Sequence, residues 1–95
     1  MNKIKSYLGF AVKSNKLIYG IDNIELSKRK KYVILISVDA SENLHKKAKS
    51  YAEKYSIPFI KLNETLEELI YKNNCKIIAL LDKNMADAVI NTFGR

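Results

Sequence analysis

Residues 32–43 of the sequence read YVILISVDASEN, and this stretch decides the class of fold. Tyr32–Val38 is a continuous apolar run rich in β-branched residues, which is typical of a central strand buried on both faces. Asp39 and Glu42 then have the spacing of a helix N-cap and the third residue of its helix. The stretch therefore predicts a buried strand, an N-cap at Asp39 and a helix over Ser41–Tyr55.

The same alternation of strand and helix continues on both sides of this stretch. Toward the N-terminus, apolar spacing predicts a helix over Asn2–Lys13, a short strand at Leu17–Tyr19 and a short helix over Ile21–Ser27. Toward the C-terminus, it predicts a strand at Phe59–Leu62, a helix opened by Asn63 or Thr65, a strand at Lys76–Leu81, and a helix capped by Asp82 and ended by Gly94. Strands that alternate with helices predict crossover connections and an α/β sandwich.

The helix expected over Ser41–Tyr55 has one apolar face. The residues expected to be buried there are Leu44, Ala48, Tyr51, Ala52 and Tyr55. His45 falls on the opposite face and is expected in solvent. Cys75 directly precedes an apolar strand and is expected to be a half-buried apolar residue.

Length and cysteine usage limit the possible settings of the protein. A chain of 95 residues supports one modest core, so we expect a single domain over residues 1–95. Neither a run of about 18 apolar residues nor an apolar secretory core is present, so we expect no membrane span and no signal peptide. The single cysteine cannot form an internal disulfide, which favours a reducing, cytoplasmic location.

The positive charge is concentrated in the first third of the chain. Residues 1–31 carry eight basic and two acidic side chains, whereas residues 32–95 carry nine and eight. A localised excess of this kind is expected of a protein that binds a phosphate backbone. An AT-rich genome would also produce a composition rich in Lys, Ile and Asn, so composition alone leaves both explanations open.

Signals for catalysis, metals and cofactors are weak. The sequence has three glycines and neither a G-x-G-x-x-G motif nor a phosphate-binding loop. With one histidine and one cysteine, we assign no catalytic residue, no metal ligand and no cofactor. Asp39 and Asp82 each follow an apolar strand, where we expect them to cap helices. The protein is therefore expected to be a binder and not an enzyme.

Four segments, taken in order, resemble the L-seven-Ae/L-thirty-e family of ribosomal proteins, which bind kink-turn RNA, and in particular its small bacterial branch. The segments are Leu8–Lys13 with Lys16, Leu17 and Gly20; the strand with Asp39, Ala40, Ser41 and Asn43; Tyr55–Pro58; and Ala79–Lys83 with Met85 and Ala86. They span residues 7–90, with a small apparent deletion after Ser27. The most specific part is a strand followed by D-A-S-x-N and by a helix that leads to x-I-P.

The resemblance implies a three-layer α/β/α sandwich around a four-stranded mixed sheet. In RNA-binding members, the helix after the glycine that corresponds to Gly20 enters the distorted major groove of a kink-turn. A loop before the last strand, which corresponds to Tyr71–Lys76, covers a flipped-out nucleotide. The resemblance and the charge pattern together give the candidate RNA-binding residues Lys13, Lys16, Gly20, Ile21, Asp22, Asn23, Lys28, Arg29, Lys30, Tyr71, Lys72, Asn73, Asn74 and Cys75.

These residue types suit contacts with RNA. A glycine lets the backbone approach RNA closely, and Asn23 can donate to and accept from a base edge. Six basic residues flank the glycine and its helix and can neutralise the phosphates of a kinked backbone: Lys13, Lys16, Lys28, Arg29, Lys30 and Lys31. Tyr71 or Cys75 could hold an unpaired base by stacking or apolar contact.

The reading element departs from the family pattern G-x-N-E-x-x-K. Counted from Gly20, the sequence has Asp22 in place of Asn, Asn23 in place of Glu and Leu26 in place of Lys. The carboxylate of Asp22 can accept but not donate hydrogen bonds, and Leu26 lacks the ammonium that contacts a base in the family. Lys28 is a candidate replacement for that lysine if the helix is short or shifted.

Two functions from different classes remain. The first is a monomeric RNA-binding protein that reads a kink-turn or another bent RNA, such as ribosomal RNA, on or off the ribosome. The second is a non-catalytic protein–protein interaction module of the ribosome or translation machinery that kept the fold and lost specific kink-turn reading. An enzyme is a weak third hypothesis, because no nucleophile–base pair, metal cluster or cofactor loop is present in the sequence.

Overall fold

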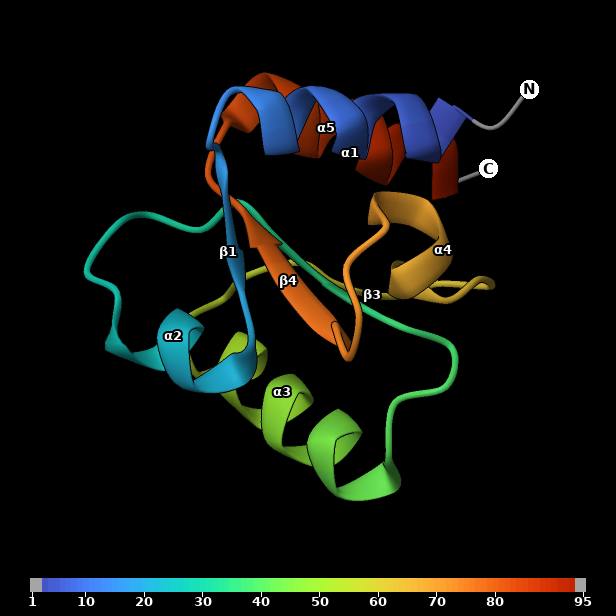
Figure 1. The fold of residues 1–95 in the computed structure, drawn as a ribbon. Coiled ribbons are helices and arrows are strands. Elements are labelled where there is room, and N and C mark those ends of the chain that lie inside the picture. Colours follow the sequence, from blue (N-terminus) through green and yellow to red (C-terminus); the bar gives the residue numbers. More distant parts are fainter. Residues whose placement is uncertain (1–2, 94–95) are drawn as a thin grey trace.

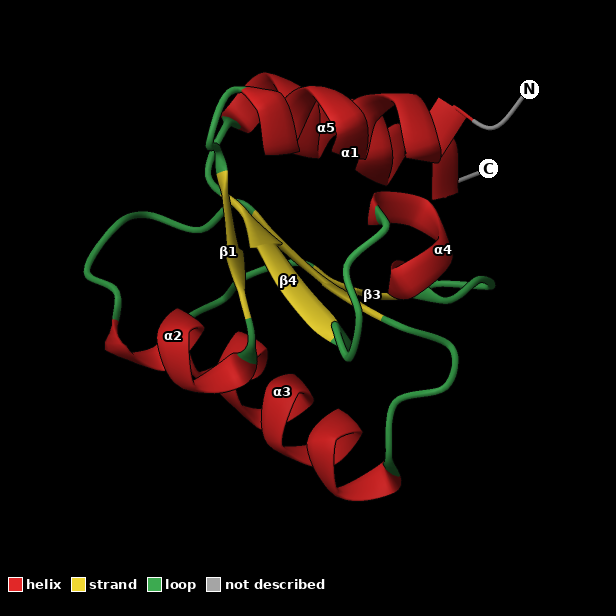
Figure 2. Cartoon of the chain, viewed as in Figure 1, coloured by secondary structure: helices red, strands yellow, loops and turns green. Residues whose placement is uncertain are grey.

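The structure is a computed structural model that describes residues 3–93 of the chain. Figures 1 and 2 show helices and strands alternating along these residues. They are α1 (Lys3–Lys13), β1 (Leu17–Tyr19), α2 (Ile21–Leu26), β2 (Val33–Ile36), α3 (Glu42–Lys54), β3 (Phe59–Lys61), α4 (Leu66–Ile70), β4 (Ile77–Leu80) and α5 (Lys83–Phe93). The predicted alternation is confirmed, while Asn2 and Gly94, expected at two helix ends, lie outside the described residues.

The four strands form one mixed sheet in the order β1-β4-β2-β3. β4 is antiparallel to both of its neighbours, β1 and β2, whereas β2 and β3 are parallel. Figure 1 shows α1, α4 and α5 on one face of the sheet and α2 and α3 on the other. The predicted three-layer α/β/α sandwich around a four-stranded mixed sheet is therefore confirmed.

The strand predicted from Tyr32–Val38 lies in the middle of the core as β2, and all four of its residues are buried. Val33 and Leu35 pack in the apolar cluster under α1, α4 and α5. Ile34 and Ile36 pack in the second cluster, under α2 and α3. Because helices cover both faces of the sheet, successive side chains enter two different cores, which explains an unbroken apolar run instead of an alternating one.

The N-cap predicted for α3 is wrong. Ser41, not Asp39, caps this helix, since the Ser41 hydroxyl accepts a 3.1 Å hydrogen bond from the backbone N–H of Leu44. Asp39 lies too far upstream to reach the first turn. The corresponding prediction for α5 is confirmed, because a carboxylate oxygen of Asp82 accepts a 3.0 Å hydrogen bond from the N–H of Met85.

The apolar face of α3 is also shorter than predicted. Ala48 and Ala52 are buried as expected, but Tyr55 is 55% exposed. Tyr55 is the C-cap residue, with φ −106° and ψ 10°, so its backbone has already left the helix and its side chain no longer follows the core face. His45 is half-buried instead of solvated, because its ring packs edge-on against Phe59 at a centroid distance of 5.3 Å.

Asp39 belongs to a polar cluster that links the end of β2, α4 and the segment before β4. Its carboxylate accepts hydrogen bonds from the Ser37 hydroxyl (2.5 Å) and the Lys76 ammonium (2.6 Å). The same ammonium lies 3.1 Å from a carboxylate oxygen of Glu67. The other Glu67 oxygen accepts a 2.8 Å hydrogen bond from the backbone N–H of Asn74. This cluster fixes the segment between α4 and β4 against the end of the sheet.

These contacts change the pKa values of all three charged groups. The hydrogen bonds from Lys76 and then Ser37 lower the pKa of Asp39. The hydrogen bonds from the Asn74 N–H and then Lys76 lower the pKa of Glu67. The two carboxylates in turn raise the pKa of Lys76. The folded protein therefore favours the charged form of each group, which couples stability to pH.

We expect Ser41→Ala to lower the free energy of unfolding by about 1 kcal/mol, because it removes the side-chain cap of α3. The matched control is Ser50→Ala, the same substitution at an exposed position inside the same helix, where alanine's helix propensity should make it neutral or slightly stabilising. Urea unfolding followed by circular dichroism measures both variants. Equal losses of stability in the two variants would contradict the assignment of the cap.

We expect Lys76→Met to destabilise the protein in a pH-dependent way. The lowered pKa values of Asp39 and Glu67 give a contribution that is complete above their unfolded pKa, about 4, and is lost as the pH falls through their folded values. The raised pKa of Lys76 gives a contribution that is complete below about 10 and is lost as the pH rises through its folded value. The stability difference between wild type and variant should therefore be largest near neutral pH.

The measurement is urea unfolding of both proteins from acid to alkaline pH. Lys83→Met is the matched control, since Lys83 forms an exposed ion pair with Asp87, one turn along α5, at 2.9 Å. This exposed pair should contribute little at any pH. A difference between wild type and Lys76→Met that stays constant across the pH range would show that the cluster does not couple folding to pH.

Candidate nucleic-acid interface

The turn at Gly20 connects β1 directly to α2. Gly20 has φ 84° and ψ 145°, a conformation that residues with a side chain rarely adopt, and no side chain caps the helix that follows. The nearest neighbour of a Cβ at this position would be the Asn23 amide nitrogen, 4.0 Å away, so backbone conformation and not space requires glycine here. Asn23 braces the turn by donating a 2.9 Å hydrogen bond to the carbonyl oxygen of Tyr19.

The start of α2 and the segment 71–76 lie at the same end of the sheet. Because β1 runs antiparallel to β4, the last residue of β1, Tyr19, faces Ile78 near the start of β4. The Gly20 N–H then donates a 3.0 Å hydrogen bond to the carbonyl oxygen of Ile77. The Lys72 ammonium lies 4.6 Å from the centroid of the Tyr19 ring. Figure 1 shows the α4–β4 segment and the start of α2 at the same end of β4.

Within segment 71–76, Tyr71 and Cys75 have opposite environments. Tyr71 is 77% exposed, and its backbone is left-handed, with φ 55°. The Lys5 ammonium lies 4.6 Å from its ring centroid. Cys75 is 6% exposed and belongs to the core, and burial raises the pKa of its thiol. Of the two residues expected to contact a flipped-out base, only Tyr71 presents its side chain to solvent.

α2 contains no basic side chain, and its two carboxylates are paired with a lysine of α3. The Lys47 ammonium, from α3, lies 3.8 Å from the carboxylate of Asp22 and 3.6 Å from that of Glu25. Leu26, at the position of the family's lysine, is 80% exposed and lies one turn after Asp22. We call residues 20–23 with residues 71–74 the Gly20 surface. Its charge is mixed: Asp22 and Lys72 lie on it, and the ion pairs of Lys76 with Asp39 and Glu67 lie next to it.

Apart from Lys72, the basic residues proposed from sequence are at the opposite end of the sheet. The carbonyl oxygen of Lys16 accepts a 2.8 Å hydrogen bond from Leu81, and the N–H of Tyr32 donates a 2.9 Å bond to Leu80, so both connections meet the far end of β4. A four-residue strand spans about 13 Å. The structure therefore divides the sequence-predicted set into Gly20, Ile21, Asp22, Asn23, Tyr71, Lys72, Asn73, Asn74 and Cys75 at one end, and Lys13, Lys16, Lys28, Arg29 and Lys30 at the other.

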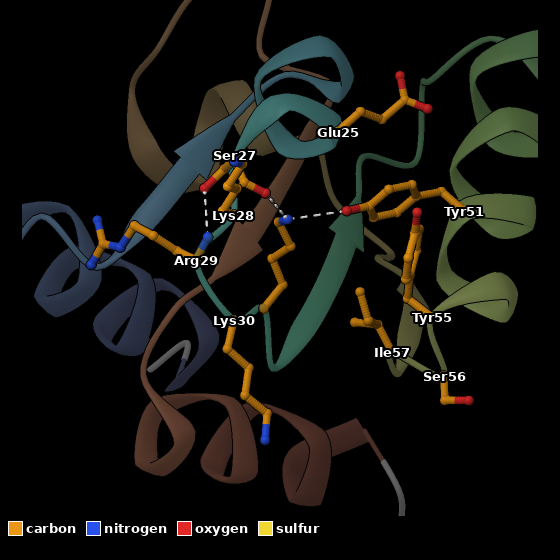
Figure 3. A pocket seen from close by; sticks show the side chains of 10 residues that line it. Glu25, Ser27, Lys28, Arg29, Lys30, Tyr51, Tyr55, Ser56 and Ile57 are labelled. Atoms are coloured by element: carbon orange, nitrogen blue, oxygen red, sulfur yellow. Dashed lines mark hydrogen bonds between the residues drawn. The ribbon is translucent and has the colours of Figure 1, made fainter.

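A groove of about 480 Å³ opens at this second end, which we call the basic groove. Its lining residues come from the α2–β2 connection and from the end of α3: Glu25, Ser27, Lys28, Arg29, Lys30, Lys31, Tyr51, Tyr55, Ser56 and Ile57. Figure 3 shows Tyr51 and Tyr55 projecting from the α3 side, opposite the basic segment. Sequence analysis identified the cations and assigned both tyrosines to the core face of the helix. Tyr51 is half-buried and packs against the core as expected, but Tyr55 is exposed, because helical spacing cannot show where a helix runs past its core.

Lys31 holds the two walls of the basic groove together. Its ammonium donates hydrogen bonds to the carbonyl oxygen of Ser27 (2.6 Å) and to the Tyr51 hydroxyl (3.0 Å), drawn as dashed lines in Figure 3. The Tyr51 hydroxyl in turn lies 3.4 Å from the carbonyl oxygen of Ile24 in α2. Lys31 is thus a structural residue, whereas Lys28, candidate replacement for the family's lysine, is exposed beyond the end of α2.

Two kinds of feature are not found within residues 3–93. No helix there is both long and apolar enough to span a membrane. No three metal-ligating side chains gather in that range either.

The fold of this chain is shared with another solved structure. A solved structure of a protein of unknown function from Bacillus halodurans C superposes with a TM-score of 0.85 at 20% sequence identity, over 100% of both chains. At this identity the likeness shows the fold alone. No curated protein is similar enough in sequence to count as a relative.

Residues 2–90 of the chain match the sequence model of a ribosomal protein family. This match includes the Gly20 turn, β2 with Asp39–Ser41, and the segment before β4, all of which the structure places around one sheet. The chain therefore belongs to the ribosomal protein L7Ae/L30e/S12e/Gadd45 family.

Proposed function

We propose that this protein binds a bent RNA of the kink-turn type through the Gly20 surface. Membership in the family supports RNA binding by a non-catalytic protein. One observation carries the proposal further: the Gly20 N–H is hydrogen-bonded to Ile77, which keeps the start of α2 beside the segment that bears Tyr71. A single bent RNA can contact both parts at once.

Each part of the Gly20 surface has a distinct task in this proposal. The side chain of Asp22 is exposed and can accept hydrogen bonds from base amino groups. The exposed ring of Tyr71 offers a flat face on which an unpaired base can stack. Lys72, whose ammonium lies over Tyr19, supplies positive charge between these two positions. The RNA is a structured RNA, with ribosomal RNA as one candidate, and the protein acts as a cytoplasmic monomer.

The exposed Leu26 favours the second candidate function, a protein interaction module. An apolar side chain that is 80% exposed stands where RNA-binding members have a lysine. A single exposed leucine is common in proteins, so it carries less weight than the arrangement of Gly20 and Tyr71. The two functions differ in their response to RNA geometry, which the following experiments measure.

Wild-type protein should bind a kink-turn RNA more tightly than the same stem without its bulge, and the preference should persist near physiological salt. Tyr71→Ala should weaken kink-turn binding about tenfold, the effect of losing one stacked base, and leave stem binding unchanged. Tyr71→Phe, which keeps the ring, should retain the affinity. Fluorescence anisotropy across a salt series measures all three proteins, and equal, steeply salt-dependent binding to both RNAs would favour the interaction module.

Leu26→Lys should strengthen kink-turn binding about tenfold, because it restores an ammonium beside the base-reading turn of α2. The control is Phe10→Lys, which adds the same charge at a position of α1 that is 63% exposed. This control should raise affinity for kinked and unbulged RNA alike, through non-specific attraction only. If Leu26→Lys behaves like Phe10→Lys, α2 does not enter the groove of the RNA.

A further inference from the structure

The basic groove has the composition of a site for a single nucleotide strand. Tyr51 and Tyr55 have ring centroids 4.8 Å apart at an interplanar angle of 50°, and Tyr55 remains 55% exposed. The volume of the basic groove, about 480 Å³, is in the range of pockets that hold small organic ligands. A partly exposed ring that packs against a second ring can stack with a base, because every base has an aromatic face. The Lys54 ammonium lies 5.3 Å from the centroid of the Tyr55 ring.

The charge at the rim of the groove is strongly positive. Among the described residues 3–93, no carboxylate forms an ion pair with Lys28, Arg29 or Lys30. Figure 3 shows the tyrosines projecting from one wall, whereas the side chains of Arg29 and Lys30 start at the other wall and extend away from the tyrosines, along the outer side of the rim. Glu25 is the acidic residue in the lining, and Lys47 lies 3.6 Å from its carboxylate. The groove thus has a stacking surface on one wall and three cations without a carboxylate partner at the rim of the other, where the Lys30 ammonium lies 5.2 Å from the centroid of the Tyr32 ring.

We propose that the basic groove binds single-stranded RNA, with a base stacked on Tyr55 and adjacent phosphates held by Lys28, Arg29 and Lys30. The site goes beyond the proposed function, because it lies at the opposite end of the sheet from the Gly20 surface. Lys31 does not contact the strand; it keeps the basic segment against α3 through Ser27 and Tyr51. A structured RNA with a single-stranded extension can occupy both ends of the protein at once.

RNA is a better fit to this groove than an acidic protein segment. A run of Asp and Glu would pair with the three cations, but its side chains offer no flat aromatic group to cover the exposed Tyr55 ring. A nucleotide strand supplies a phosphate and a base in each repeating unit, and these match the two kinds of wall. The dependence of binding on Tyr55 therefore distinguishes RNA from an acidic polymer.

The test uses the full chain and an unstructured uridine dodecamer as the probe, with affinity measured by fluorescence anisotropy over a salt series. Tyr55→Ala should weaken binding about tenfold, and Tyr55→Phe should keep the affinity because the ring remains. The triple variant Lys28→Gln, Arg29→Gln, Lys30→Gln should reduce the salt slope by about two units, given about 0.7 for each phosphate contact on a single strand.

Two matched controls separate this site from the rest of the protein. Lys3→Gln, Lys46→Gln, Lys61→Gln removes three exposed charges elsewhere and should change the salt slope by less than the groove variant. Tyr71→Ala, at the Gly20 surface, should leave dodecamer binding unchanged, whatever its effect on kink-turn RNA. Circular dichroism confirms that each variant is folded.

Either of two results would overturn the proposal. Unchanged dodecamer affinity in folded Tyr55→Ala would show that no base stacks in the groove. Binding of polyaspartate to the wild type with the same affinity as the dodecamer would show that the cations attract any polyanion. Loss of kink-turn preference alone would refute the Gly20 surface and leave this site untouched, so failures of the two proposals are distinguishable.

Discussion

The pairing of β4 with both β1 and β2 is the constraint on which the rest of the structure depends. β4 is the last strand in the chain but occupies an inner position of the sheet, antiparallel to both neighbours. β1 and β2 must therefore run in the same direction, and the chain between them must return along the whole sheet. This return places the start of α2 at one end and the basic segment 28–31 at the other. The two candidate RNA sites are a direct result of this topology.

The two ends differ in the chemistry they can offer to a nucleic acid. The Gly20 surface has a braced turn, an exposed tyrosine and mixed charges, so contact there depends on the shape of the partner and on hydrogen bonds. The basic groove has exposed cations and a tyrosine pair, so contact there depends on phosphates and stacking. Recognition of a particular RNA belongs to the first kind of contact and general affinity to the second. If both proposals hold, these two contributions are separated by the length of a strand.

The polar cluster around Lys76 explains how a short irregular segment can present a fixed surface. Segment 71–76 contains two residues with left-handed backbone, Tyr71 and Asn74, and no regular structure. The Glu67 carboxylate holds the Asn74 N–H, and Lys76 joins Glu67 to Asp39 at the end of β2. The core fixes the same segment from the inside through the buried Cys75. Tyr71 therefore projects from a supported segment and not from a free loop.

The sequence by itself determined the elements, the sandwich and the family resemblance. These features depend on local periodicity and on motifs read along the chain: an unbroken apolar run such as Tyr32–Val38 has few alternatives to a strand covered on both faces. Sequence analysis also identified the turn glycine and the cap at Asp82, because both need only neighbouring residues.

Only the tertiary structure decided which distant residues share a surface. The order of strands separated Lys28–Lys30 from Gly20, although ten or fewer residues lie between them in the chain. Asp39 lies upstream of the cap of α3 and pairs with Lys76, 37 residues away, and Tyr55, at the end of α3, is exposed. Charge, exposure and pairing at these positions depend on neighbours that are far apart in sequence, so no local pattern could predict them.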